Sequence, residues 1–250
     1  MRLEGKVAFI SGSTRGIGRS MAEMFAAEGA QVVVSGRSVE KGEKVAAGIR
    51  ANGGDATFVR LDVADEASVQ DAIAATVERY GKITTLINNA APTDLVSQGF
   101  KPMHELATEE WEAILRATLT GNVFWVSKYA IPHLIDAGGG SIVNISSGGS
   151  VFGVPGISVY SAAKGGMNAL TRVMAVEYAQ FGIRVNTIIV GRVVSYAQDQ
   201  GPEMTNVLTR VGNPRDVGYV ALWLAADESE WITGSEVTAD GGQRYNGSQM

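Results

Sequence analysis

Tyr160 and Lys164 have the residue types and the spacing of an acid/base pair. If a helix runs from Ser158 onward, residues four apart lie on one face, which brings the ammonium near the phenol. A free phenol has a pKa near ~10, and both a neighbouring ammonium and a place in the first helical turn favour phenolate, so we expect a lowered Tyr160 pKa. Ser147 follows an apolar run and could hold a substrate oxygen against the phenol. Taken alone, Tyr160 and Lys164 are more typical of an ordinary helix-surface pair.

The elements that would position these residues alternate along the chain. Short β-branched runs predict strands at residues 6–10, 31–35, 56–61, 83–87, 141–145, 183–189 and 235–238, and amphipathic patterns predict helices at 20–28, 39–51 and 67–80. Near-continuous Val and Ile runs indicate strands covered on both faces. The pattern predicts an α/β fold: one Rossmann-type, doubly wound parallel sheet of about seven strands with helices on both faces. With 250 residues and no break in composition, we expect a single domain, 1–250.

A glycine-rich turn, Ser11 to Gly18, follows the first predicted strand, with glycines at 12, 16 and 18. A strand, a glycine turn and a helix form an anion site, because backbone N–H groups and the helix N-terminus point at a pyrophosphate. The position of this turn in the first strand–helix unit predicts a dinucleotide site.

The end of the second strand indicates which dinucleotide is bound. A free ribose 2′-hydroxyl is usually held by Asp or Glu, but here Gly36 and Arg37 follow the strand, and Arg15 lies in the glycine turn. Two guanidinium groups suit bidentate phosphate contacts, which favours NADP(H) over NAD(H). Alternatively Arg37 stacks on adenine and Arg15 is a solvated loop residue, which would leave NAD(H) as the cofactor.

These motifs together resemble the short-chain dehydrogenase/reductases, in particular the branch similar to 3-oxoacyl-carrier-protein reductases. The resemblance covers the whole chain and rests on the glycine turn, Asp62, the Asn88–Ala90 segment, Ser147, Tyr160 with Lys164, and a closing Asp240-Gly241-Gly242. It implies that Tyr160 is the acid/base, that Lys164 lowers its pKa and binds the nicotinamide ribose, and that Ser147 orients the substrate oxygen. The implied cofactor residues are Gly12, Ser13, Arg15, Gly16, Ile17, Gly18, Arg37, Asp62, Val63, Asn89, Ala90, Tyr160, Lys164, Gly191, Val193 and Ser195.

The sequence departs from the family pattern at three places. Thr118 stands where relatives usually have an Asn that joins a proton relay to the active-site Lys, so Thr118 is a candidate catalytic residue, and Asn122, one turn on, could compensate. Val190 replaces the usual Pro, and Ser195 takes the place of a Thr that often touches the carboxamide. The loop at 91–108 is longer than usual and that at 195–210 shorter, and such loops shape substrate choice.

Composition narrows the class of protein further. A net charge of −5 without a basic run argues against nucleic acid, and the absence of cysteine excludes disulfides and thiol chemistry. We expect no metal, no signal peptide and no membrane span, hence a cytoplasmic protein. The resemblance implies a homotetramer.

The sequence therefore predicts an NADP(H)-dependent oxidoreductase that interconverts a ketone and a secondary alcohol, with a 3-oxoacyl thioester favoured by the overall resemblance. A sugar, a polyol and a cyclic or steroid-like alcohol remain open as substrates. The alternative of another class is a dinucleotide-binding sensor with little catalysis.

Overall fold

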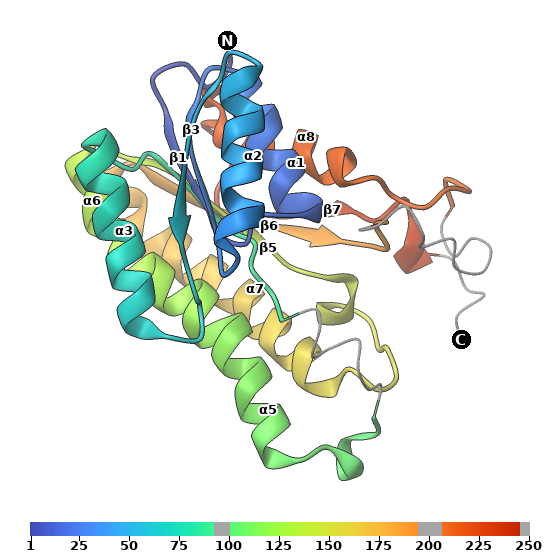
Figure 1. The fold of residues 1–250 in the computed structure, drawn as a ribbon. Coiled ribbons are helices and arrows are strands. Elements are labelled where there is room, and N and C mark those ends of the chain that lie inside the picture. The colour runs from blue at the N-terminus through green and yellow to red at the C-terminus, as the bar shows by residue number, and fades with distance from the viewer. Residues whose placement is uncertain (93–100, 195–206, 246–250) are drawn as a thin grey trace.

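Seven parallel strands form one sheet in the order β3-β2-β1-β4-β5-β6-β7 (Figure 1). In this computed structural model the structure describes residues 1–92, 101–194 and 207–245. The strands are β1 (Val7–Ile10), β2 (Gln31–Gly36), β3 (Asp55–Arg60), β4 (Thr85–Asn88), β5 (Gly140–Ile145), β6 (Ile183–Val190) and β7 (Glu236–Ala239). Each lies within two residues of a predicted strand at both ends, which confirms the predicted doubly wound sheet.

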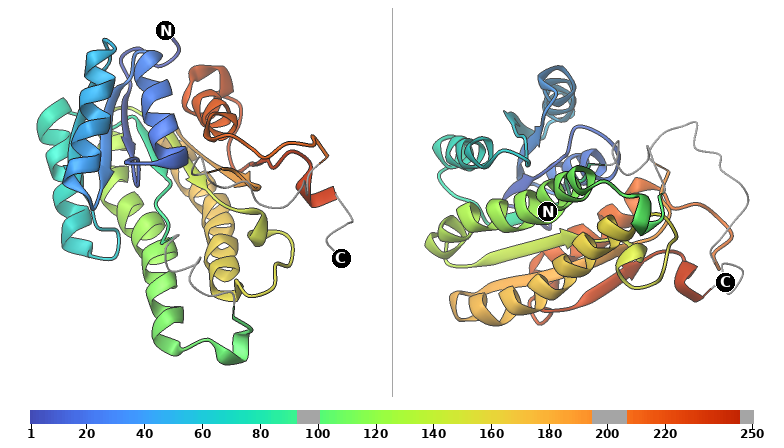
Figure 2. Two further views of the ribbon diagram at one scale, coloured as in Figure 1. Left: turned by 45° about the vertical axis from the view of Figure 1, so that its right-hand side comes forward. Right: turned by 90° about the horizontal axis from the view of Figure 1, so that it is seen from below.

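Helices cover both faces of the sheet (Figures 1 and 2). On one face lie α1 (Gly16–Ala27), α2 (Val39–Ala51) and α8 (Pro214–Ala225). On the other lie α3 (Glu66–Tyr80), α5 (Thr108–Leu115), the π-helix η2 (Arg116–Trp125), α6 (Val126–Asp136) and α7 (Ser158–Tyr178). Short 3-10 turns are η1 (Met103–Glu105), η3 (Gly148–Ser150), η4 (Ala179–Phe181), η5 (Asp227–Ser229) and η6 (Gln243–Tyr245).

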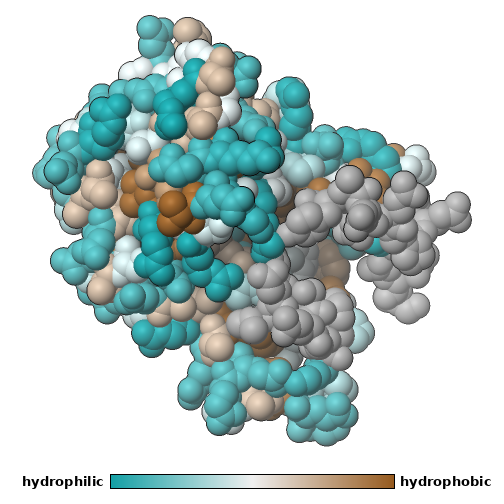
Figure 3. Space-filling model, viewed as in Figure 1, coloured by the Kyte–Doolittle hydropathy of each residue, from teal (hydrophilic) through white to brown (hydrophobic). Residues whose placement is uncertain are grey.

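Two buried apolar clusters hold these layers together. Phe25 and Val217 belong to the cluster under α1 and α8, and Phe9 and Leu134 to the cluster under α3 and α6. The predominance of fully buried Val and Ile in the central strands is what a sheet covered on both faces requires. Most of the outer face in Figure 3 is hydrophilic.

The strand order reverses between β1 and β4: β2 and β3 follow on one side of β1, and β4 to β7 on the other. Strands β1 and β4 pair directly, from Ala8 with Thr85 to Ile10 with Ile87. Because the loops after these strands diverge to opposite faces, they leave a crevice at the carboxyl edge of the sheet, where open α/β sheets bind ligands. The glycine loop after β1 and the Asn88–Asn89 segment after β4 meet at this edge.

Candidate active site

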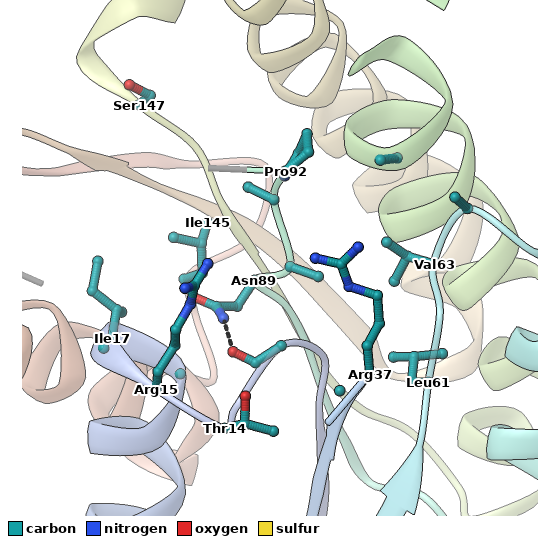
Figure 4. A pocket seen from close by; sticks show the side chains of 18 of the residues that line it. Thr14, Arg15, Ile17, Arg37, Leu61, Val63, Asn89, Pro92, Ile145 and Ser147 are labelled. Carbon is teal, nitrogen blue, oxygen red and sulfur yellow. Dashed lines mark hydrogen bonds between the residues drawn. The ribbon is translucent and has the colours of Figure 1, made fainter. Parts of the chain in front are cut away.

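The glycine loop is built for close approach by a ligand. Gly12 and Gly16 have φ of +64° and +54°, a backbone conformation that favours glycine. A Cβ on Gly18 would lie 2.3 Å from the Gly12 carbonyl oxygen and 2.6 Å from Asn89 Nδ2. Asn89 Nδ2 donates to the carbonyl oxygens of Ser11 and Gly12, both at 2.9 Å, so the end of β4 fixes the loop (Figure 4).

Ser11 and Ser13 stabilise this loop from beneath. Ser11 Oγ accepts from the backbone N–H groups of Asn89 at 2.9 Å and Ala90 at 3.0 Å, and donates to Asn122 Oδ1 at 2.6 Å. Ser13 Oγ donates to the Ile10 carbonyl at 2.8 Å and accepts from the Ser35 N–H at 2.9 Å. The Ser13 hydroxyl is fully buried and used by the fold, and Ser13 does not line the pocket. Its contact with the cofactor stays a prediction.

One end of the pocket is cationic. Arg15, at the start of α1, and Arg37, after β2, extend into it from either side (Figure 4). Lys41, the third residue of α2, also lines this end, and Ser38 caps the same helix by accepting from the Lys41 N–H. Sequence reasoning missed Lys41, although its place in the first turn after Arg37 could have indicated it.

The segment after β3 forms the adjoining wall, where Leu61, Asp62 and Val63 line the pocket. Asp62 Oδ1 accepts from the Ala64 N–H at 3.0 Å, which shapes the turn, while Asp65 caps α3. Helix η2 packs directly on this turn, because a Cβ on Gly121 would lie 1.6 Å from the Val63 carbonyl oxygen.

The other end of the pocket is lined by Ser147, Tyr160 and Lys164. Figure 4 labels Ser147 of these three. Helix α7 begins at Ser158, as predicted, so Tyr160 lies in its first turn. The Ser147 hydroxyl acts on the Tyr160 phenol and favours its ionised form. Lys164 Nζ lies 5.6 Å from the centre of the Tyr160 ring and donates to the Ile145 carbonyl at 2.6 Å. The residues expected to act as acid/base, substrate-orienting hydroxyl and ammonium thus share one wall.

The protonation of this pair differs from the sequence prediction. Burial raises the pKa of Tyr160 to about 12, and the Ser147 hydroxyl opposes this rise. Burial also lowers the pKa of Lys164 to about 7, because a dry interior disfavours an ammonium. The expected lowering of the Tyr160 pKa by a fully charged Lys164 is therefore wrong for this state. The effect of burial on the Tyr160 pKa outweighs the effect of the Lys164 charge.

Thr118 and Asn122 lie on the π-helix η2, both fully buried. In the described part of the chain, Thr118 Oγ1 and Asn122 Nδ2 have no hydrogen-bond partner. Asn122 Oδ1 is held by Ser11, so Asn122 supports the glycine loop. Thr118 does not line the pocket, and its part in a proton path stays a prediction.

The segment after β6 closes the pocket. Val190, Gly191 and Val193 line it, and a Cβ on Gly191 would lie 2.6 Å from the Asp240 backbone. The predicted contact Ser195 lies outside the described residues, as do parts of the two loops expected to shape substrate choice.

The pocket has a volume of about 1130 Å³, large enough for an extended dinucleotide. The predicted residues that line it are Gly12, Arg15, Gly16, Ile17, Gly18, Arg37, Asp62, Val63, Asn89, Ala90, Ser147, Tyr160, Lys164, Gly191 and Val193. The described residues include no cluster of three metal-ligating side chains. Over the same residues, every helix is too short or too polar to span a bilayer.

Comparison with known proteins agrees with this geometry. A family profile described as short chain dehydrogenase matches residues 6–205. A 2,5-dichloro-2,5-cyclohexadiene-1,4-diol dehydrogenase of Sphingobium indicum is 40% identical over 248 residues, covering 96% of this chain and 97% of the relative. An NADP-dependent (R)-specific alcohol dehydrogenase of Lentilactobacillus kefiri is 36% identical, with 96% and 97% covered.

Two further proteins extend the comparison. A 3-oxoacyl-[acyl-carrier-protein] reductase of Thermotoga maritima is 34% identical, covering 97% of this chain and 99% of the relative. The solved structure of a short-chain type dehydrogenase/reductase from Mycobacterium ulcerans superposes with a TM-score of 0.92, covering 98% of this chain and 92% of that one. At 24% identity, that likeness speaks for the fold alone.

Proposed function

The chain belongs to the short-chain dehydrogenase family, and on that basis we propose that it is an NADP(H)-dependent oxidoreductase that interconverts a ketone and a secondary alcohol. Named relatives in the family are oxidoreductases acting on CH–OH groups. The observation that carries the proposal is the placement of Ser147, Tyr160 and Lys164 on one wall of a pocket whose other end is cationic.

The residues present fit a dinucleotide phosphate. The glycine loop leaves no room for a Cβ at Gly18 and would cradle the pyrophosphate at the N-terminus of α1. Arg15, Arg37 and Lys41 would hold a 2′-phosphate, and Gly36 stands where a carboxylate would select the free hydroxyl. When bound, the nicotinamide supplies or accepts the hydride.

The protein's own groups would handle the proton. In the reductive direction, Tyr160 Oη donates its proton to the carbonyl oxygen, while the Ser147 hydroxyl donates a hydrogen bond to the same oxygen and fixes its position. In the oxidative direction, the phenolate accepts the alcohol proton. The Ile145 carbonyl fixes Lys164 Nζ beside the phenol ring. Lys164 would favour the phenolate only in the molecules in which its amine is protonated.

For the substrate, we propose a 3-oxoacyl thioester first, supported by the named reductase among the relatives. A sugar or polyol is a further alternative. A cyclic or steroid-like alcohol is also supported, by the relatives named as a cyclohexadienediol and a 7alpha-hydroxysteroid dehydrogenase. Apolar side chains, including Pro92 and Ile145, lie between Ser147 and the arginine pair in Figure 4 and suit an alkyl or ring substituent equally.

The test is NADPH and NADH consumption over a panel of such ketones, with Tyr160→Phe and Arg37→Ala beside the wild type. We expect turnover with NADPH that is lost in Tyr160→Phe while cofactor binding is kept, because the aromatic ring remains and only the hydroxyl group that carries the proton is removed. Arg37→Ala should weaken NADPH binding at least tenfold and leave NADH nearly unchanged. Tight NADPH binding with no turnover across the panel would favour the sensor alternative.

We further propose that this single domain acts in the cytoplasm as a homotetramer. Support for self-association comes from exposed apolar side chains on η2 and α7, two helices that contact each other: Phe124 is 52% exposed, Val173 50% and Val176 80%. A monomer in light scattering at micromolar concentration would contradict this assembly.

A further inference from the structure

The half-buried Ser150 and the buried Asn168 form a hydrogen-bonded pair behind Ser147. Asn168 is 4% exposed, and its Nδ2 donates to Ser150 Oγ at 3.0 Å. Ser150 Oγ donates in turn to the Ser147 carbonyl at 2.6 Å, and the Ser150 N–H donates to the same oxygen at 2.9 Å. Neither Ser150 nor Asn168 lines the pocket.

The direction of these hydrogen bonds is fixed. A hydroxyl has one proton, and that of Ser150 goes to the Ser147 carbonyl, so Ser150 Oγ can only accept from its other neighbours. Those neighbours are Ser146 Oγ at 3.2 Å and Asn168 Nδ2 at 3.0 Å. Asn168 must therefore act as the donor, and its Oδ1 is left buried without a partner among the described residues.

The segment that this pair holds has little stiffness of its own. Ser147 is followed by Gly148 and Gly149. Glycine can adopt more backbone conformations than any other residue, so the sequence of this turn does not make it rigid. A Cβ on Gly148 would lie 2.5 Å from the Phe152 ring and one on Gly149 2.9 Å from Ile157 Cδ1, so a larger residue at either position would displace these side chains. A flexible turn next to Ser147 needs an anchor elsewhere.

Helix α7 supplies that anchor and also carries the acid/base. Tyr160, Lys164 and Asn168 follow one another at intervals of four residues, on one face of the helix. Asn168 holds the Ser147 backbone through Ser150. The Ser147 hydroxyl in turn acts on the Tyr160 phenol, which the same helix carries. The contacts form a closed ring between the turn and the helix.

We propose that Asn168 and Ser150 are positioning residues that set the Ser147 hydroxyl against the Tyr160 phenol. The inference rests on the proposed function, since it concerns the same proton-transferring site. Neither residue touches the substrate or the cofactor. Their effect on catalysis passes through Ser147.

Two variants test the ring. Asn168→Asp keeps the shape but, when ionised, has no donor, so the Ser150 proton turns to the carboxylate and leaves the Ser147 carbonyl. Ser150→Ala removes the link without introducing a charge. For both we expect kcat to fall roughly tenfold, the effect of one misplaced hydrogen bond, with the NADPH Kd within about twofold of wild type.

A merely structural role would not move the pH profile. Because the Ser147 hydroxyl lowers the Tyr160 pKa, its displacement should move the pH profile of alcohol oxidation toward higher pH in both variants. Asn186→Asp is the matched control: Asn186 is also fully buried and hydrogen-bonded, to the Ile232 carbonyl and the Ser235 N–H, but lies away from the pocket. It should lower Tm and leave both kcat and the pH profile unchanged.

Hydrogen–deuterium exchange of residues 147–152 gives a readout that needs no turnover. We expect roughly tenfold faster exchange there in Asn168→Asp and Ser150→Ala, and no local change in Asn186→Asp. Exchange that is unchanged in Asn168→Asp and Ser150→Ala overturns the inference. A loss of kcat in these variants no larger than that of an Asn186→Asp protein with the same Tm overturns it too. A wild type that binds NADPH but reduces no ketone contradicts the proposed function instead, and the exchange data still decide whether the ring holds Ser147.

Discussion

Replacing Lys164 with Met should change how the stability of the free protein depends on pH. Lys164 is 1% exposed, and burial lowers its pKa from 10.5 to about 7. Between these two values the unfolded chain binds a proton that the folded protein does not. The free energy of unfolding therefore rises with pH across this interval, and below pH 7 the folded protein bears the full cost of charging a buried amine.

The size of the effect follows from the same interval. At ~1.4 kcal/mol per pH unit, the interval from about 7 to 10.5 corresponds to about 5 kcal/mol, an upper limit because bound water can relieve part of the burial. Between pH 7 and pH 9.5 the expected gain is about 3 kcal/mol. Tyr160 acts in the opposite direction, since its pKa is raised to about 12, but it does so only above about pH 10 and equally in both proteins.

The assay is urea unfolding of wild type and Lys164→Met, without cofactor, at pH 7, 8 and 9.5. Loss of the Lys164 hydrogen bond to the Ile145 carbonyl adds an offset that does not depend on pH, and other titrating groups cancel between the two proteins. We expect the stability of wild type relative to the variant to increase by about 3 kcal/mol from the lowest to the highest pH. Parallel curves would refute the reasoning, because they would mean that Lys164 stays protonated in the folded protein.

Three further substitutions test the packing around the pocket. Gly121→Ala places a Cβ 1.6 Å from the Val63 carbonyl oxygen, so we expect a loss of at least about 2 kcal/mol in urea unfolding. Ser11→Ala leaves the N–H of Asn89 without its acceptor and should cost about 1–3 kcal/mol, with weaker NADPH binding by fluorescence titration. Thr118→Val keeps the shape and removes a buried hydroxyl that has no partner among the described residues, so thermal unfolding should show a gain of about 1 kcal/mol. A loss there would show that the hydroxyl is hydrogen-bonded in solution.

Local patterns predicted the framework of the site. The alternation of strands and helices and the start of α7 at Ser158 both depend on neighbours along the chain. The spacing of Tyr160 and Lys164 placed both on one face of a helix for the same reason. The sequence could also place Gly12 and Asn89 at strand ends, which meet wherever a parallel sheet is wound in this way.

Only the tertiary structure decided what each of these groups is surrounded by. Whether the hydroxyl of Ser13 faces the pocket or the Ile10 carbonyl, and whether Asn168 anchors Ser147, depends on segments that are far apart in sequence and packed together in the fold. The prediction of a lowered Tyr160 pKa was wrong because the spacing of residues shows only which charge is near. The loss of solvent around Tyr160 and Lys164 depends on every layer packed around the pair. The sequence alone determines which groups are present and in what local order. Their protonation and orientation are decided by burial, which is a property of the whole fold.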